Sequence, residues 1–359
     1  MSKHINFVGL FNSPVSWAKI LRNYAYFYSL KRDNVTILPR RGYFYQKDKI
    51  IDEKLKSLKL LEKGAVPDVQ IAFEYPQNYA YLVAPRKIGL MVYETDVLPD
   101  EWVRNINRYL DMLIVPNKFC EKIMLNNGVR VPVRIVPYGV DLNEYSAFSG
   151  KQEKHKQLTF LHIALPHKRK ATDIVLAAFL DAFRANEDVK LIIKMPGWSK
   201  NKLPWEYDIR KEAGLPNDKV AIIAEPYTDR QMSKLYKSAD VFLQPSFSEG
   251  FGMSILEAFA SGIPAVVTGF GAQMEFCNDE NSFIIGYKPI AANEIQYDVD
   301  TPGNNAVVGR ADQDELVSVL RKIYKNPRIA HDKKHAAIKT AEAYTWQTAV
   351  DKLIESIEN

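Results

Sequence analysis

Residues Val241 to Val267 read VFLQPSFSEGFGMSILEAFASGIPAVV, which predicts a strand, a glycine-containing loop, a helix and a second strand. Gly250 and Gly252 flank Phe251 where a tight turn must open the helix, and glycine tolerates the backbone angles that such a turn needs. The first amides of a helix lack acceptors within the helix, and the helix dipole adds positive charge there. We therefore expect a phosphate-binding site at the helix start. The residues expected to form it are Phe251, Gly252, Met253 and Ser254.

Two glutamates accompany this helix start. Glu257 follows Gly252 by five residues, which places it roughly 7 to 8 Å along the helix at about 1.5 Å per residue. A carboxylate at that distance from a diphosphate can accept hydrogen bonds from both hydroxyls of a ribose. Glu249 lies in the preceding loop, where it would face sugar hydroxyls. In the alternative interpretation, Glu249 only favours its own helix N-terminus and Glu257 is solvated.

Short apolar runs alternate with segments of helical period along the rest of the chain. The runs extend from Asn6–Leu10 to Val133–Val136 in the first half, and from Thr159–Ile163 to Phe283–Ile285 in the second. This pattern is typical of βα units around mostly parallel sheets and predicts an α/β fold with two doubly wound domains. The turn at Pro137 to Asp141 and the polar stretch Ser146 to Gln157 that follows indicate a boundary near residue 150. We expect domains at residues 1–150 and 151–343.

Composition supports two ordinary domains and excludes several classes. The chain has 359 residues, 47% hydrophobic and 25% charged, which is typical of a globular protein with two cores. The formal charge of +5 suits anionic substrates or peripheral membrane contact but is too weak to indicate nucleic-acid binding. No apolar run approaches the roughly 18 to 20 residues needed to span a bilayer, and no secretory signal sequence is evident, so we expect a cytoplasmic protein. Cys120 and Cys277, the two cysteines, do not indicate a disulfide framework or a zinc site.

The Glu249 and Glu257 pair, with seven residues between them in SEGFGMSILEAFASGIPAVV, resembles the signature of glycosyltransferase family 4. Similarity extends upstream to Leu235-Tyr236 and downstream to Gly271-Ala272-Gln273-Met274-Glu275. The resemblance implies the GT-B architecture, in which two Rossmann-like domains face each other across a cleft. It also implies sugar transfer with retention of configuration and without a metal ion. We therefore expect no cofactor, and a GDP- or UDP-linked sugar as the donor.

A second segment, from His162 to Asp173, resembles the family's strand, basic loop and helix start. Lys170 matches the family lysine, which would neutralise the departing diphosphate. Arg169 is expected to bind the donor, although a solvated basic loop is the alternative. The chain departs from the family at Leu165, where arginine is usual, and at Ala164 and Ala171, where glycine is usual. His162 is interpreted as a core histidine, and a histidine that reaches the donor from the strand end is the alternative.

Landmarks in the first half are also similar to the family's. Tyr93-Glu94-Thr95-Asp96 matches the place from which acceptor-side residues project, so Glu94 joins Glu249 and Lys170 as an expected catalytic residue. Ser13, Ser16 and Trp17, after the first strand, are candidates for acceptor or phosphate contacts. Helix capping is the alternative for the two serines.

The function predicted from these residues is transfer of a hexose to a hydroxyl acceptor on a glycan, a glycoprotein or a glycolipid. Mannose from GDP-mannose is the first choice among donors. A nucleotide-sugar epimerase of the same fold and a non-catalytic carbohydrate- or nucleotide-binding module stay open as alternatives, as does a homodimer. Asp298 and Asp300 have the DxD spacing of metal-dependent transferases but lie in an expected loop, so no metal site is predicted.

The last part of the chain predicts a long surface loop over Tyr287 to Ala311 and then three helices. The final helix, Trp346 to Ile357, carries an apolar stripe at helical spacing. In the family the terminal helix packs back on the N-terminal domain. We therefore assign residues 344–359 to the first domain.

Overall fold

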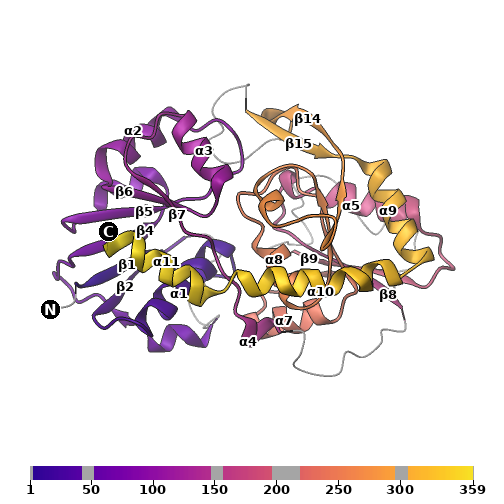
Figure 1. Ribbon diagram of the computed structural model, residues 1–359, viewed down its shortest axis with the longest axis horizontal. Helices are drawn as coiled ribbons and strands as arrows, with labels where there is room; N and C mark the ends of the chain where they lie inside the picture. The colour runs from indigo at the N-terminus through magenta and orange to yellow at the C-terminus, as the bar shows by residue number, and fades with distance from the viewer. Residues whose placement is uncertain (1–2, 43–51, 147–156, 196–218, 296–305, 359) are drawn as a thin grey trace. The chain divides into compact units, whose positions relative to one another are not determined.

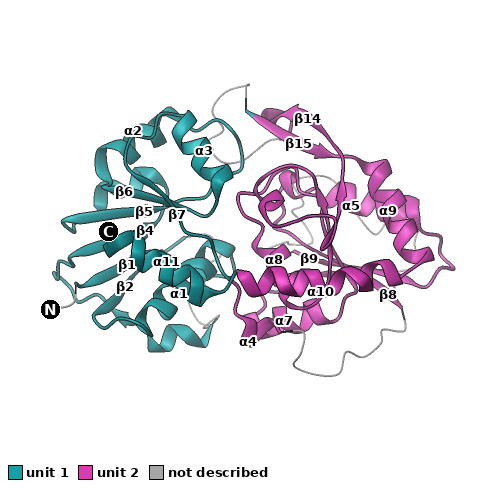
Figure 2. Cartoon of the chain, in the orientation of Figure 1, with its two compact units in different colours: residues 1–139, 300–306, 344–359 teal, residues 140–299, 307–343 magenta. Residues whose placement is uncertain are grey.

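A computed structural model describes residues 3–42, 52–146, 157–195, 219–295 and 306–358. These residues form two compact units, shown in different colours in Figure 2. Unit 1 takes the described residues up to Gly139 and from Tyr344, and unit 2 takes nearly all of those between. Each unit has its own sheet and its own apolar core.

Unit 1 contains a parallel sheet in the order β3-β2-β1-β4-β5-β6-β7. Figure 1 shows α1 and α11 side by side, in agreement with their contacts. The strands are β1 (Ile5–Leu10), β2 (Val35–Arg40), β3 (Lys59–Leu60), β4 (Val69–Phe73), β5 (Arg86–Leu90), β6 (Met112–Val115) and β7 (Val133–Ile135). The helices are α1 (Ser16–Ser29), α2 (Asp100–Tyr109), α3 (Lys118–Asn126) and α11 (Trp346–Glu358), with 3-10 turns η1 (Glu53–Ser57) and η2 (Pro76–Tyr81).

Unit 2 contains a second parallel sheet, in the order β10-β9-β8-β11-β12-β13, and a separate pair of strands, β14 and β15. The strands are β8 (Leu158–Ile163), β9 (Val189–Lys194), β10 (Val220–Ile223), β11 (Val241–Gln244), β12 (Ala265–Thr268), β13 (Ser282–Ile285), β14 (Tyr287–Ala291) and β15 (Val307–Ala311). The helices are α4 (Leu142–Tyr145), α5 (Thr172–Ala182), α7 (Asp229–Lys237), α8 (Met253–Ala260), α9 (Gln313–Lys325) and α10 (Arg328–Ala343), with 3-10 turns η3 (Lys168–Lys170), η4 (Ala272–Glu275) and η5 (Ala292–Ile295).

The central strands explain the alternating pattern of the sequence. Every residue of β4, β6, β11 and β12 is buried, as expected for parallel strands covered on both faces. Local signals fix several helix starts, because Thr228 and Gln231 form a capping box at α7 and Asn117 caps α3. The two parallel sheets confirm the predicted α/β class.

One prediction about the fold is wrong. Tyr287 to Ala311 was expected to be a loop, but Tyr287–Ala291 and Val307–Ala311 pair as antiparallel strands. The backbone of β15 packs closely on Phe270 at Gly309, where an added Cβ would lie 2.7 Å from Cβ of Phe270. Phe270 in turn packs edge-on against Tyr287, with ring centroids 5.1 Å apart. This packing involves residues distant in sequence, and periodicity within the segment does not reveal it.

The units separate after Gly139, whereas the polar stretch in the sequence predicted a domain boundary near residue 150. Helix α4 belongs to unit 2, where Tyr145 is fully buried and its ring centroid lies 5.9 Å from that of Tyr236. Across the described parts of the chain, none of the helices combines the length and apolar character needed to cross a bilayer.

Candidate functional site

The loop between β11 and α8 turns sharply before the helix begins. Gly252 is the N-cap of α8 and adopts a left-handed conformation, with φ of 99°, which favours glycine. An added Cβ there would lie 3.1 Å from Cδ1 of Ile255. Phe251 is buried, with its ring centroid 5.6 Å from that of Phe276. The amides of Met253 and Ser254 therefore stand at the start of a firmly held helix, as an anion site requires.

Glu249, in the same loop, is the centre of a polar cluster. Its Oε1 accepts hydrogen bonds from Nζ of Lys170 at 2.6 Å and from Nε2 of Gln244 at 2.8 Å. Its Oε2 lies 3.4 Å from Nη1 of Arg169. Although burial raises the pKa of Glu249, the positive charges of Lys170 and Arg169 and the hydrogen bonds to the carboxylate lower it to about 2. Glu249 is therefore a fixed carboxylate at neutral pH.

The two basic residues come from η3, after β8, and they differ in exposure. Arg169 is buried and donates from Nη1 to the Ser248 carbonyl at 2.5 Å, while its own carbonyl accepts from the Phe247 amide at 2.8 Å. These contacts brace the loop before α8, and the alternative of a solvated arginine is wrong. Lys170 is half-buried. Ala171, which follows, adopts the left-handed conformation with φ of 54°, and this explains why glycine suits the position.

Glu257 is buried within unit 2, so the alternative of a solvated glutamate is also wrong. Its Oε2 accepts a hydrogen bond from the Tyr236 hydroxyl at 2.9 Å. Tyr236 is itself fully buried, with its ring centroid 5.7 Å from that of Phe242. The tyrosine therefore fixes the orientation of the Glu257 carboxylate.

His162 lies in β8 close to this cluster and is fully buried. Its Nδ1 is 2.8 Å from the Leu243 carbonyl, which can only accept, so Nδ1 carries the proton. Its Nε2 therefore accepts from the Thr172 hydroxyl at 2.9 Å. Burial, together with the charge of Lys170, lowers the pKa of His162 to about 4 although the Leu243 carbonyl and Glu249 oppose this. Both ring nitrogens are used, as the interpretation of a core histidine expects.

The remaining predicted residues lie elsewhere. Glu94 belongs to unit 1, where it follows β5 and is half-buried. Asp298 and Asp300 lie outside the described residues. Within the described part of the chain, no three His, Cys, Asp or Glu side chains are grouped so that they could hold a metal ion.

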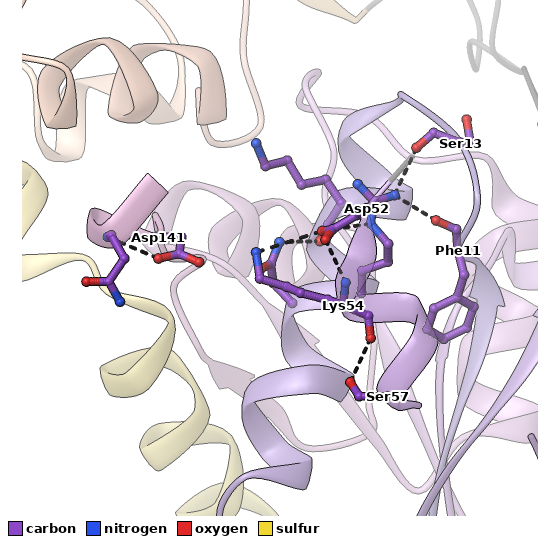
Figure 3. A network of polar contacts seen from close by, with 10 residues as sticks. Phe11, Ser13, Asp52, Lys54, Ser57 and Asp141 are labelled. Carbon is purple, nitrogen blue, oxygen red and sulfur yellow. Dashed lines mark hydrogen bonds and ion pairs between the residues drawn. The ribbon is translucent and has the colours of Figure 1, made fainter. Parts of the chain in front are cut away.

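The loop after β1 carries the other residues singled out from the sequence. Ser13 and Ser16 do not cap α1, because its N-cap is Val15 and no side chain caps it. The loop is instead held by buried Arg22, whose Nη1 donates to the carbonyls of Phe11 at 2.6 Å and Ser13 at 2.9 Å. Figure 3 shows this network, in which Asp52 pairs with Arg22 at 3.4 Å.

Sequence reasoning missed Gln244 and Tyr236 as partners of the two glutamates. Gln244 is a fully buried polar residue in the otherwise apolar strand Val241–Gln244. That mismatch was the available signal, because a buried amide needs polar partners. Tyr236 gave no comparable signal, since a tyrosine on an amphipathic helix is ordinary.

Comparisons with known proteins show what this chain is similar to. The family model described as glycosyl transferases group 1 matches residues 143–343. An alpha-monoglucosyldiacylglycerol synthase of Streptococcus pneumoniae is 27% identical over 46% of this chain and 39% of its own length. A GDP-mannose-dependent alpha-(1-6)-phosphatidylinositol dimannoside mannosyltransferase of Mycobacterium tuberculosis is 25% identical over 62% of this chain and 51% of its own. The chain thus spans about half or less of these relatives' length.

A solved structure shows the same fold. Anabaena Alr3699/HepE in complex with UDP and glucose superposes with a TM-score of 0.75 at 15% identity, covering 99% of this chain and 100% of its own. The match confirms the predicted GT-B fold.

Proposed function

The chain belongs to the glycosyl transferases group 1, and from this membership we propose that it moves a hexose from a nucleotide-sugar donor to a hydroxyl of an acceptor. The acceptor is a glycan, a glycoprotein or a glycolipid. The observation that carries the proposal is the ion pair of Lys170 with Glu249, 2.6 Å long, in the loop that leads to α8. It brings a cation and a carboxylate together at the loop before α8, and this supports a site for an anionic donor.

The charges suit a diphosphate leaving group. Lys170 and Arg169 carry two positive charges and Glu249 one negative charge, so the cluster keeps one net positive charge. Bond cleavage builds negative charge on the diphosphate. Fixed cations and helix amides stabilise that charge without rearranging. We therefore propose that Lys170 and the amides of Met253 and Ser254 bind the diphosphate, and that no metal ion is required.

Glu257 and Glu249 have separate roles in this proposal. Tyr236 orients the carboxylate of Glu257, and we assign this carboxylate to the ribose hydroxyls of the donor. Glu249 orients the hexose, since its ionised state makes it an acceptor for sugar hydroxyls. Arg169 acts on the donor through the loop that it braces.

The donor is GDP- or UDP-linked, with GDP-mannose as our first choice. The Mycobacterium tuberculosis relative, by its name, depends on GDP-mannose. The name of the Streptococcus pneumoniae relative instead indicates glucose and a lipid acceptor. We propose retention of configuration, which the anomeric coupling constant of the product would establish by NMR.

The test incubates the full chain with GDP-mannose or UDP-glucose, with and without a panel of methyl glycosides and glycolipids, in excess EDTA. We expect nucleotide release that depends on an acceptor and persists in EDTA. Lys170→Met should lower kcat by about 100-fold, the usual cost of losing one preorganised stabilising group. Activity lost on chelation and restored by manganese would overturn the metal-free mechanism. A donor that is epimerised without an acceptor would overturn transfer itself.

A further inference from the structure

His162, in β8, is a fully buried imidazole that the proposed transfer does not use. Burying an imidazole costs free energy unless its ring nitrogens have partners. The two partners of His162 come from different elements, because Leu243 belongs to β11 and Thr172 begins α5. The imidazole therefore joins three elements of unit 2.

The first link runs through β11 to Glu249. Backbone pairing of β8 with β11 stops one residue earlier in each strand, and the imidazole extends it, since Nδ1 of His162 donates to the Leu243 carbonyl at 2.8 Å. Gln244 follows Leu243 in the chain, and its Nε2 donates to Oε1 of Glu249 at 2.8 Å. The imidazole thus fixes the strand end from which this amide reaches the carboxylate.

The second link runs through the start of α5 to Lys170. The hydroxyl of buried Thr172 donates to Nε2 of His162 at 2.9 Å, and it has no other partner among the described residues. The N-cap of α5 is Ala171, which forms no side-chain cap and adopts a left-handed conformation that is unfavourable for alanine. The hydrogen bond to His162 therefore helps to hold this turn, in which Lys170 directly precedes Ala171.

The two links meet at one oxygen atom. Nζ of Lys170 lies 2.6 Å from Oε1 of Glu249, which is also the acceptor for Gln244. One imidazole thus supports both groups that donate to this oxygen. We propose that His162 is a positioning residue for Lys170, and that it acts as the uncharged tautomer with its proton on Nδ1, because its Nε2 accepts from Thr172.

This inference rests on the proposed function for its effect on the donor, but the link to Lys170 is measurable without transfer. Thr172→Val removes the hydroxyl and keeps nearly the same side-chain shape. We combine it with Lys170→Met in a double-mutant cycle on the full chain, which detects whether one residue acts through the other. Urea unfolding measures the cycle without a ligand, and calorimetry measures it with GDP and UDP.

We expect Thr172→Val to weaken binding of GDP or UDP by about five- to ten-fold when Lys170 is present. In the Lys170→Met background, the same change should weaken binding by less than about two-fold. The unfolding cycle should also be non-additive, because either change already disturbs the ion pair with Glu249. Thr172→Ser, which keeps a hydroxyl, should retain most of the affinity. A histidine that only stabilises the fold would give additive effects instead.

The matched control is Thr268→Val. Thr268 is also buried in the sheet of unit 2, at the end of β12, but its hydroxyl has no hydrogen-bond partner among the described residues. Its replacement should therefore be additive with Lys170→Met. Nitrogen-15 NMR of histidine-labelled protein provides a second readout. It should show His162 with Nδ1 protonated and Nε2 unprotonated, and the Nε2 signal should shift in Thr172→Val.

The proposal is overturned if Thr172→Val and Lys170→Met are additive in unfolding, or if NMR shows a proton on Nε2 of His162. Non-additive unfolding without any nucleotide binding would remove the proposed donor site and leave the positioning role. Nucleotide binding on which the two changes act additively would remove the positioning role and leave the donor site.

Discussion

Glu257 is a buried carboxylate with one oxygen fixed by Tyr236 at 2.9 Å. We predict that Glu257→Ala weakens nucleotide binding by about 1 to 3 kcal/mol, the cost of losing hydrogen bonds to a charged acceptor. Tyr236→Phe is the control, since it removes the orienting hydroxyl but keeps the carboxylate, and it should cost less. Calorimetry with GDP and UDP measures both. Unchanged affinity in Glu257→Ala would remove this residue from the ribose.

Gln244 donates to Glu249 at 2.8 Å from a fully buried position. Its replacement by leucine removes a hydrogen bond to the ionised form and so raises the pKa of Glu249 from its value of about 2. A pKa lowered by folding stabilises the native state above the unfolded pKa, near 4.5, and this contribution is lost as pH falls towards 2. Gln244 Nε2 also donates to the Ser246 hydroxyl at 2.7 Å, which does not titrate. The stability difference between wild type and Gln244→Leu should therefore be largest above pH 4.5 and fall to this pH-independent part near pH 2.

Urea unfolding at several pH values measures that difference, which should be about 1.5 to 3 kcal/mol at neutral pH. Gln273→Leu is the control. Gln273 is equally buried, but its Nε2 donates to the Thr268 and Phe270 carbonyls, which do not titrate. Its stability cost should stay constant over the same pH range. A constant cost for Gln244→Leu as well would show that Glu249 does not depend on this amide.

At the scale of single elements, the turn between η3 and α5 stores backbone strain. Ala171 is the C-cap of η3 and the N-cap of α5, in the left-handed conformation. Because this conformation is unfavourable for alanine, Ala171→Gly should stabilise the protein by about 0.5 to 1 kcal/mol. Asn34→Gly is the comparison, since Asn34 has φ of 63° but asparagine tolerates it. Equal gains in melting temperature at the two sites would contradict this explanation.

The sequence predicted elements whose signal is local. Buried parallel strands such as Val241–Gln244 appear as apolar runs, and the start of α8 is marked by its glycines. The β14–β15 hairpin was missed because the contact of Gly309 with Phe270 that anchors it joins distant parts of the chain. The same reason hid the partners of Glu249, since Lys170 lies 79 positions away from it. Motif spacing identified both residues, but not their ion pair or the burial of Arg169.

Over the whole molecule, the two units differ in how much of their sequence the family model matches. The family model covers residues 143–343, nearly all of unit 2. The proposed donor-binding residues all lie in unit 2. The proposed donor site thus lies in the unit with the stronger family signal.

The chain's last helix, α11, completes the core of unit 1. Trp346 is fully buried, and its ring centroid lies 5.3 Å from that of Tyr24 in α1. Gly139 leaves no room for a side chain here, because an added Cβ would clash with the backbone of Thr345 and Trp346. Further along, Arg86 donates to the Ile357 carbonyl. Unit 1 therefore depends on a segment that the chain reaches only after completing unit 2.

Truncation after Ala343 should therefore destabilise unit 1 and spare unit 2. Loss of the buried Trp346 side chain alone should lower the free energy of unfolding by about 3 to 5 kcal/mol. Trp346→Ala in the full chain measures this contribution separately. We expect the truncated protein to aggregate more readily, melt earlier and lose transfer, because the apolar surface of α1 is exposed. It should still bind GDP or UDP in calorimetry, since no proposed donor contact is removed. Full activity with an unchanged melting temperature would show that α11 is dispensable, and lost nucleotide binding would show that unit 2 also needs it.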